Sequence, residues 1–149
     1  TVERLDPITP DALWTFVDVA TSGFRTDDEP MDDGVLATSR PMVEHPRCDA
    51  FVARLDGRVV GASLMESAPP VAGLFLTSVL PAARRRGIQA ALMVRRLDRA
   101  AERGCELVCI HADPGIATEN NARRLGFELA YTRAILAMPG EGLVRAKLD

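Results

Sequence analysis

Three consecutive arginines and a glycine, Arg84, Arg85, Arg86 and Gly87, are the residues of this chain best placed to do chemistry. Residues 71–80 before them are apolar and predict a buried strand, and a helical period begins after Gly87. A turn that joins a strand to a helix start presents unpaired backbone N–H groups, to which the helix dipole adds partial positive charge. Because three guanidinium charges lie in the same turn, the sequence predicts a phosphate-binding site.

Two common nucleotide-binding motifs do not fit this turn. A P-loop requires Gly-x-x-x-x-Gly-Lys-[Ser/Thr], and the chain contains no Lys-Ser or Lys-Thr pair. A Rossmann turn requires three spaced glycines, of which only Gly87 is present. An arginine triplet can also be a solvated turn or a nucleic-acid contact, but a net charge of −3 argues against general nucleic-acid binding. The pattern therefore favours a pocket for the phosphate of a smaller ligand.

The turn resembles the pyrophosphate-binding turn of the GNAT N-acetyltransferases. The family motif is [Gln/Arg]-x-x-Gly-x-[Gly/Ala], preceded by a strand and often by Val-x-Pro. Here Val79 and Pro81 match the Val-x-Pro element, and residues 84–89 match the motif, with Gln89 standing where the family has a small residue.

A second segment, residues 114–127, resembles a later GNAT motif in which an Asn precedes a helix that ends in Gly-Phe. Asn121 matches the motif Asn, which the resemblance implies would hydrogen-bond the pantetheine arm of coenzyme A. Gly126 stands where a helix C-terminus favours a left-handed residue, and Phe127 follows as its hydrophobic contact. The family often has a Tyr about three residues before this Gly as the acid for the leaving thiolate. Arg123 occupies that place, so this role is not carried over.

The resemblance covers the C-terminal half of the chain and implies a GNAT-like α/β (α+β) fold, with a mixed, mostly antiparallel sheet of six to seven strands and helices on both faces. It implies acetyl-CoA as the acyl donor and an amine of a small molecule or peptide as the acceptor, acetylated by direct attack. The pantetheine would lie between two splayed strands and pair with the free edge near residues 77–80, where one N–H from residues 77–79 would polarise the thioester carbonyl. The implied cofactor-binding residues are Thr77, Val79, Leu80, Arg84, Arg85, Arg86, Gly87, Ile88, Gln89, Ala90 and Asn121.

Direct attack requires a neutral amine, and the residues that could act as base or acid are few. Residues 71–80 contain no Glu or Asp, although family members often place a Glu on this strand. His111 ends the next predicted strand and has a side chain suited to general-base catalysis, or serves as a structural histidine. Tyr131, on the strand expected after Phe127, could protonate the thiolate or be a core aromatic residue. Ser78 could relay a proton, but a structural role at the strand end is favoured.

Because few residues could act as catalytic base or acid, a second function stays open: the chain could be a non-catalytic acyl-CoA-binding sensor of the same fold. A metal-dependent Cys/His hydrolase is a third, because Cys105, Cys109 and His111 share strand parity. Ligands spaced so widely on one strand do not converge on zinc, Asp113 is the only nearby addition, and buried cysteines are the simpler interpretation. The acidic residues of segment 27–33 could attract a cationic amine or be a solvated loop.

Length and composition set the outer bounds. At 149 residues, 47% apolar and 26% charged, the chain is predicted to be one globular domain, residues 1–149. Three widely spaced cysteines favour reduced thiols and a cytoplasmic location. No apolar run is long enough for a membrane span, so neither membrane nor nucleic acid is an expected partner. The oligomeric state is left open, with a homodimer as one outcome, since GNAT folds often pair through exposed strand edges.

Strands and helices are predicted to alternate along the chain. Hydrophobic periodicity and turn residues predict strands at 2–5, 50–55, 58–65, 71–80 and 106–111, the last of them buried. Helices are predicted at 11–20, at 35–43 and from the arginine turn to Gly104. Asp56 and Gly57 form a strong signal for a type I′ hairpin turn.

The helix after the turn is predicted to be amphipathic. The residues expected on its buried face are Ala90, Met93, Val94, Leu97, Ala100 and Ala101. Those expected on its solvated face are Arg95, Arg96, Asp98, Arg99, Glu102 and Arg103. Ile88 and Leu92 lie on the polar side in the first turn, so the helix start is expected to be covered there by a ligand, by another layer or by a hydrophobic staple.

Overall fold

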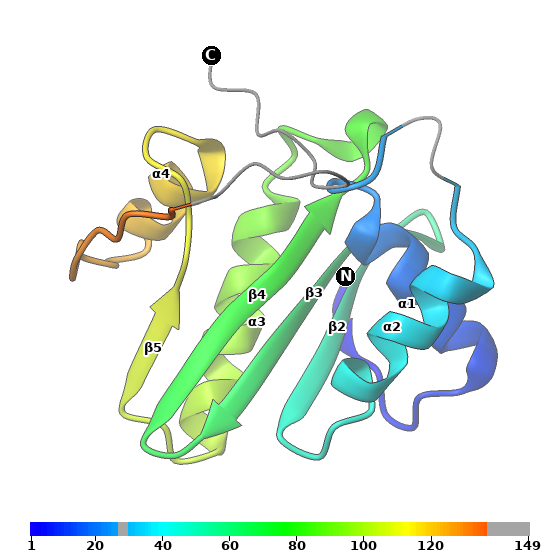
Figure 1. Cartoon of the computed structure of the whole chain (residues 1–149), viewed down its shortest axis with the longest axis horizontal. Helices are drawn as coiled ribbons and strands as arrows, with labels where there is room; N and C mark the ends of the chain where they lie inside the picture. Colours follow the sequence, from blue (N-terminus) through cyan, green and yellow to red (C-terminus); the bar gives the residue numbers. More distant parts are fainter. Residues whose placement is uncertain (27–29, 137–149) are drawn as a thin grey trace.

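The centre of the molecule is a sheet of five strands, seen in a computed structural model that describes residues 1–26 and 30–136 (Figure 1). The strands lie side by side in sequence order: β1 (Val2–Arg4), β2 (Cys48–Leu55), β3 (Arg58–Ala68), β4 (Val71–Val79) and β5 (Leu107–Ile110). Neighbouring strands from β1 to β4 are antiparallel, whereas β4 and β5 are parallel. The expectation of a mixed, mostly antiparallel sheet is confirmed.

The number of strands differs from the prediction, since residues 1–26 and 30–136 contain five instead of six to seven. Residues 128–136, where a strand carrying Tyr131 was expected, have no regular secondary structure. A strand exists only where a partner satisfies its backbone, and β5 offers just four residues as a neighbour. Residues 137–149 lie outside the described part of the chain.

Helices cover both faces of the sheet, as predicted. On one face lie α1 (Pro10–Thr21), which packs on β3 and β4, and α2 (Asp33–Val43), which packs on α1 and β2. On the other face lie α3 (Ile88–Glu102) and the short α4 (Ala117–Arg124) (Figure 1). The described residues thus form three layers, with one hydrophobic core on each side of the sheet. No helix in residues 1–26 and 30–136 is long and apolar enough to cross a membrane.

Local signals account for the starts of the first two helices and for the hairpin. Thr9 caps α1 by accepting a hydrogen bond from the backbone of Ala12 at 3.2 Å, and Asp32 caps α2 in the same way through Val35 at 2.8 Å. Between β2 and β3, the turn residues Asp56 and Gly57 have φ of 50° and 78°, the left-handed geometry that the Asp-Gly pair predicts.

Strand β4 is paired unequally on its two sides. On the β3 side the pairing extends from Val71 to Val79, with a register shift that places an extra β4 residue opposite Ser63. On the β5 side it stops after Leu74, so the remainder of β4 has a free backbone edge (Figure 1). Leu76 lies in the irregular stretch with φ of 48°, a left-handed conformation in a residue that is not glycine. The strands therefore separate next to a bulge.

The face that α3 turns to the sheet was predicted only in part. Met93 and Ala100 are buried and Leu97 packs against the core, as predicted, but Leu92 and Arg96 are buried too, whereas Val94 and Ala101 are exposed. Arg96 has 0% relative exposure although it was assigned to the solvated face. Its position, three residues after Met93 and four before Ala100, is a core position; the charge of the side chain concealed this in the sequence.

A second group of arginines surrounds a buried carboxylate at the opposite end of α3. Asp49 of β2 is 2% exposed and accepts hydrogen bonds from Arg4 at 3.2 Å, Arg99 at 3.3 Å and Arg103 at 2.9 Å. These bonds connect β1, β2 and α3. Arg99 and Arg103 are therefore not simply solvated, as was expected, because Asp49 draws them onto the sheet.

Replacing Asp49 with Asn should destabilise the fold by about 3 kcal/mol, because it breaks a buried charge network and takes from Arg103 its one acidic partner in the described residues. Chemical denaturation measures this loss in the free energy of unfolding. The matched control is Glu66→Gln, which breaks the exposed pair with Arg47 and should cost less than about 1 kcal/mol. Equal effects of the two substitutions would show that burial of Asp49 adds nothing.

The short helix α4 has a carboxylate at its first turn. Glu119 accepts a hydrogen bond from the backbone N–H of Gly115 at 2.6 Å and another from Arg123 at 2.8 Å. The Gly115 hydrogen bond first, and Arg123 second, lower the pKa of Glu119 below its ordinary value of 4.5. The carboxylate therefore stabilises the start of α4 at neutral pH.

A carboxyl group with a depressed pKa in the folded state contributes stability above the ordinary value of 4.5, and this stability is lost as pH falls through the lowered pKa. We expect the Glu119 side-chain carbon signal to titrate in NMR with a midpoint below 4.5. Amide exchange in α4 should accelerate over the same acidic range. Glu119→Gln should remove this pH dependence, and a midpoint at or above 4.5 would contradict the assignment.

Candidate functional site

The turn after β4 has the geometry of an anion-binding site. A 3-10 turn, Pro81–Ala83, follows the strand, and Gly87 then serves as the N-cap of α3. Arg85 and Gly87 have φ of 62° and 75°, so left-handed residues alternate with ordinary ones. Such an alternation directs successive backbone N–H groups toward one side, the arrangement known as a nest.

The backbone N–H groups of this turn are free. The first N–H of α3 to bond along the helix is that of Ala91, which donates to the Gly87 carbonyl at 3.0 Å. Across the described residues, the N–H groups from Arg85 to Ala90 donate to no other group. A Cβ added at Gly87 would meet nothing within 4 Å among the described residues, so the space beside this glycine is open. The turn can therefore accept an anion without rearrangement.

The arginine side chains of the turn keep their charge available. Arg84, Arg85 and Arg86 are all exposed, and none forms an ion pair with an acidic residue in residues 1–26 or 30–136. Arg84 is anchored, because its Nε donates to the carbonyl oxygen of Val79 at 3.1 Å. The anchor holds one cation against the end of β4, and the other two remain extended into solvent.

Gln89, the departure from the family motif, connects α3 to α4. Its Nε2 donates to Thr118 Oγ1 at 2.8 Å, and its Oε1 accepts from Asn121 Nδ2 at 2.7 Å. Asn121 Oδ1 in turn accepts from Arg124 at 3.3 Å. The structure thus brings together two residues that were predicted to contact the cofactor, Gln89 and Asn121, but one N–H of Asn121 is already used by Gln89.

The free edge of β4 leads directly into the turn. Thr77 and Val79 lie on this edge, beyond the last residue that pairs with β5. Leu80 follows, and its N–H is directed to the other side, where it donates to Val60 at 2.9 Å. Of the predicted backbone donors, Leu80 is therefore occupied within the sheet.

Ser78 has a structural partner, in agreement with the interpretation favoured from the sequence. It is 6% exposed, and its hydroxyl lies 3.0 Å from that of Ser22 at the end of α1. Gly23 allows this approach, because a Cβ there would be only 2.8 Å from Ser78 Oγ. The end of α1 is thereby fixed to the end of β4, beside the free edge.

The two predicted acid–base residues lie outside the core. His111 directly follows β5 and is exposed, and Tyr131 is 69% exposed within the irregular segment 128–136. The expectation that Tyr131 lies on a strand is wrong for this structure. Within the described residues, neither side chain is hydrogen-bonded to another group. Their catalytic roles stay predictions.

Strand β5 is an edge strand instead of the buried strand that was expected. Leu107 is 57% exposed and Cys109 is exposed, while Val108 and Ile110 face α3. Cys105 is half-buried. No group of three or more His, Cys, Asp or Glu side chains is arranged to hold a metal ion in the described ranges.

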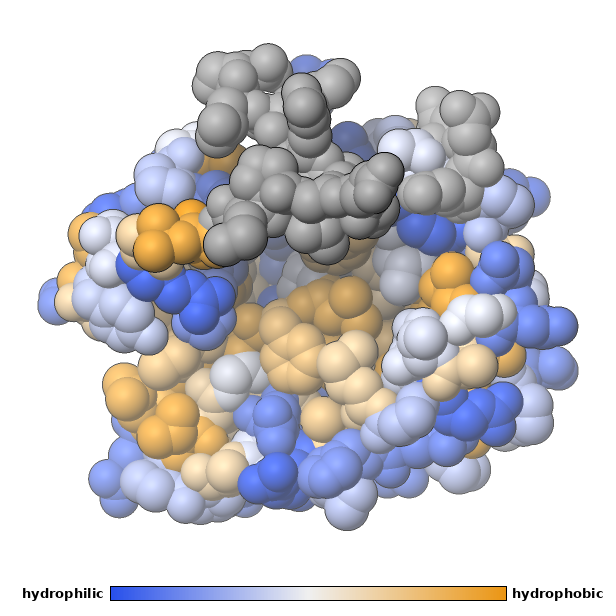
Figure 2. Space-filling view, in the orientation of Figure 1, coloured by the Kyte–Doolittle hydropathy of each residue, from blue (hydrophilic) through white to orange (hydrophobic). Residues whose placement is uncertain are grey.

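The face of β4 and β5 opposite α3 is open and apolar. The parallel register places Val71 beside Leu107 and Gly73 beside Cys109 on this face. Figure 2 shows apolar side chains gathered in the hollowed middle of the surface, over the part of the sheet that α1 and α2 do not cover. A second substrate would reach a ligand bound along the free edge of β4 from this face of the sheet, because α3 covers the opposite face.

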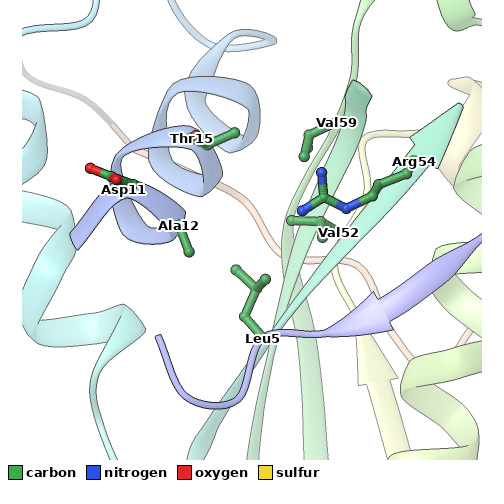
Figure 3. Close-up of a pocket in the computed structure, with 7 residues that line it drawn as sticks. All are labelled: Leu5, Asp11, Ala12, Thr15, Val52, Arg54 and Val59. Atoms are coloured by element: carbon green, nitrogen blue, oxygen red, sulfur yellow. The ribbon is translucent and has the colours of Figure 1, made fainter. Parts of the chain in front are cut away.

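Two cavities lie beyond β4, toward β1 and β2. One, of about 320 Å³, includes Arg86, Gly87 and Ile88 in its lining and adjoins the anion-binding turn. The other, of about 240 Å³, lies between α1 and the strands (Figure 3). There Arg54 points inward while Asp11 points away, and Arg54 is already paired with Glu3 at 2.7 Å. The second cavity therefore has little capacity for chemistry.

Comparisons with known proteins agree with this geometry. The sequence profile of the acetyltransferase (GNAT) family matches residues 13–127. The chain is similar to an aminoglycoside acetyltransferase from an uncultured soil metagenomic sample, solved with sisomicin (18% identity, TM-score 0.71, 94% of this chain and 95% of that chain). It is also similar to AAC(6')-Iy solved with a bisubstrate analog (18% identity, TM-score 0.75, 94% and 98%) and to a Trypanosoma brucei acetyltransferase (18%, 0.71, 93% and 99%).

No curated protein matches the chain. The solved structures share less than a quarter of their residues with it, so they establish the fold alone. The family profile, in contrast, extends over most of the sequence and includes both the arginine turn and the Asn121 helix. The chain belongs to the GNAT acetyltransferase family.

Proposed function

We propose that this chain is an N-acetyltransferase that moves an acetyl group from acetyl-CoA to an amine of a small molecule or peptide. The observation that carries the proposal is the continuity of two features, the free edge of β4 and the free N–H groups from Arg85 to Ala90. A ligand that fills both must have amides at one end and an anionic group at the other. The pantetheine arm and diphosphate of coenzyme A have this order.

The turn fits a diphosphate for three independent reasons. Its backbone donors are unsatisfied, its arginines have no acidic partners in the described ranges, and Gly87 leaves space for close approach. Charged hydrogen bonds to phosphate are stronger than neutral ones, so the exposed guanidinium groups add affinity as well as orientation. The same lack of side-chain bulk at Gly87 makes this position sensitive to substitution.

Residues beyond Leu74 on β4 would bind the pantetheine amides as a neighbouring strand does. This arrangement places the acyl end of the ligand near the bulge at Leu76, where backbone N–H groups could bind the thioester oxygen. Coenzyme A supplies the activated acyl group when bound. The protein supplies position, since converting the encounter to a fixed geometry removes much of the entropic barrier.

The acceptor would approach from the open apolar face over β4 and β5. Its neutral nitrogen attacks the thioester carbon, a C–N bond forms, the C–S bond breaks, and the thiolate departs while the ammonium proton passes to a base or to water. A lysine-like amine with a pKa of roughly 10.4 is less than about 0.1% neutral at pH 7. An amine with a pKa near 7.7 is roughly one-sixth neutral. Weakly basic acceptors therefore need no dedicated base.

His111 is our candidate for the base, because it directly follows β5 at the end where β4 and β5 separate. Tyr131 is a candidate for the acid that protonates the thiolate, which requires segment 128–136 to approach the site. Two structural neighbours support a small-molecule amine as the acceptor. One was solved with sisomicin and the other with an acetylneamine-based bisubstrate analog. Segment 27–33, with its acidic side chains, would attract such cations.

Cofactor binding is tested by substituting Gly87 and Gly104 with Asp. Both glycines have φ of 75° and neither has an atom within 4 Å of an added Cβ, so the two substitutions carry the same backbone strain. Only Gly87→Asp places a carboxylate in front of the anion-binding donors. Isothermal titration should show CoA affinity reduced about 100-fold in Gly87→Asp, the equivalent of losing one or two charge-assisted hydrogen bonds.

Gly104→Asp should leave the dissociation constant unchanged while lowering the thermal unfolding midpoint by as much as Gly87→Asp does. If CoA binds wild type and both variants equally, the turn is not the diphosphate site. If CoA and acetyl-CoA fail to bind the wild-type chain, the proposed function itself is wrong.

Catalysis is tested by thiol release from acetyl-CoA in the presence of polyamines, aminoglycosides, amino acids and peptides. We expect turnover with at least one class, and faster turnover for amines of lower pKa at neutral pH. His111→Ala should shift the acidic limb of the pH–rate profile if His111 is the base, whereas Tyr131→Phe should lower the rate without moving that limb. Tight acetyl-CoA binding without turnover on any amine would favour the acyl-CoA sensor.

A further inference from the structure

Arg96 of α3 is a buried cation that the proposed chemistry has not yet used. It has 0% relative exposure, and no carboxylate in residues 1–26 or 30–136 pairs with it. Burial lowers the pKa of its guanidinium to about 10, so the group is still charged at pH 7. An uncompensated charge in the core is costly.

The guanidinium is directed at the bulge in β4. Its Nη1 donates to two carbonyl oxygens, that of Leu64 on β3 at 3.1 Å and that of Phe75 on β4 at 3.4 Å. Its Nε donates to the carbonyl of Leu92 one turn earlier in α3, which fixes the side chain beneath the sheet. Leu64 and Phe75 are the paired residues at one border of the register shift. Arg96 therefore joins both strands where the ladder is interrupted.

The bulge requires support, because Leu76 has φ of 48°. A left-handed conformation costs a residue that is not glycine about 1–2 kcal/mol, and a bulge also removes ladder hydrogen bonds. The bond from Arg96 satisfies the carbonyl of Phe75, the residue that precedes Leu76. This carbonyl and the N–H of Leu76 belong to the same peptide group. A charged donor on the oxygen polarises that group and makes its N–H a stronger donor.

We propose that Arg96 is a positioning residue that holds and polarises the β4 bulge, so that the backbone N–H groups of the bulge bind the acyl oxygen of acyl-CoA. The inference rests on the proposed function and deepens it. Arg96 does not touch the substrate in this arrangement and acts through the Phe75–Leu76 peptide. The positive charge beneath the bulge also favours the negative charge that develops on the acyl oxygen during attack.

The alternative is that Arg96 only fills the core. The two roles are separated by Arg96→Met, which keeps an unbranched side chain but removes the charge and its hydrogen bonds. Replacing a buried charge by an apolar residue is often neutral or stabilising, so the loss of the Leu64 and Phe75 bonds should be largely offset. We expect the thermal unfolding midpoint to change by only a few degrees, while recognition of the acyl group declines.

The decisive measurement is the ratio of the dissociation constants for CoA and acetyl-CoA, determined by titration calorimetry. The two ligands share every contact with the turn and differ only in the acyl group. In Arg96→Met the preference for acetyl-CoA over CoA should fall about three- to tenfold relative to wild type, the value of one hydrogen bond. The carbonyl stretch of bound acetyl-CoA labelled with carbon-13 should move back toward its frequency in water.

Arg96→Lys should restore part of the ratio, since its ammonium retains the charge but reaches fewer carbonyls than the forked guanidinium. Arg95→Met is the matched control, because Arg95 precedes Arg96 on the same helix but is exposed, and it should leave both affinities unchanged. If Arg96→Met does not fold, Arg96→Leu takes its place as the uncharged variant, and its ratio is read in the same way.

An unchanged ratio and an unchanged carbonyl frequency in a folded, uncharged Arg96 variant would overturn the inference while leaving the proposed function intact, provided that both ligands still bind. Failure of either ligand to bind wild type would instead reject the proposed function. A large loss of stability with no change in the ratio would assign Arg96 to the core alone.

Discussion

The unequal pairing of β4 is the constraint on which the other features of the site depend. β3 holds this strand along its whole length, whereas β5 holds it only as far as Leu74. A strand released on one side but fixed on the other gives a backbone edge that is both available and rigid, which is what an extended ligand with amide groups requires. The turn that follows is fixed to the end of this strand, because the Arg84 side chain donates a hydrogen bond to the Val79 carbonyl and α3 begins at Ile88.

Helix α3 contributes buried or half-buried arginines to two places, and within residues 1–26 and 30–136 only one of these places contains a carboxylate. Toward its C-terminus, Arg99 and Arg103 neutralise the buried carboxylate of Asp49, and the result is a stable connection between layers. Nearer the site, Arg96 is buried, and its hydrogen-bond acceptors in the described residues are all backbone carbonyl oxygens. A carboxylate beside a buried cation compensates its charge and cancels most of its electric field. A buried cation without a carboxylate keeps its electric field but lowers the stability of the fold. The unpaired cation is the one that lies next to the bulge.

The sequence predicted features that depend on neighbouring residues. The Asp56-Gly57 hairpin, the first two helices and the arginine turn are encoded by local spacing, and all are found in the structure. It did not predict the burial of Arg96 or the ring of arginines around Asp49, because both depend on contacts between segments far apart in the chain. Position 96 has the helical spacing of a buried position relative to Met93 and Ala100. It was assigned to the solvated face because its residue is an arginine. The exposure of β5 could not be foreseen either, since a short apolar run is compatible with an edge strand and with a central one.

Gln89 illustrates how a departure from a motif can be compensated within the fold. A small residue at this position would lack the side-chain hydrogen bonds by which Gln89 joins the first turn of α3 to Thr118 and Asn121 of α4. The junction forms in the chain without a ligand, so the entropic cost of ordering these side chains falls on folding and not on a ligand that reaches the turn. The backbone donors of α3 are unaffected, because the Gln89 side chain is directed toward α4 while its N–H stays free. The bulkier residue thus adds rigidity to the wall of the site without occupying its anion-binding donors.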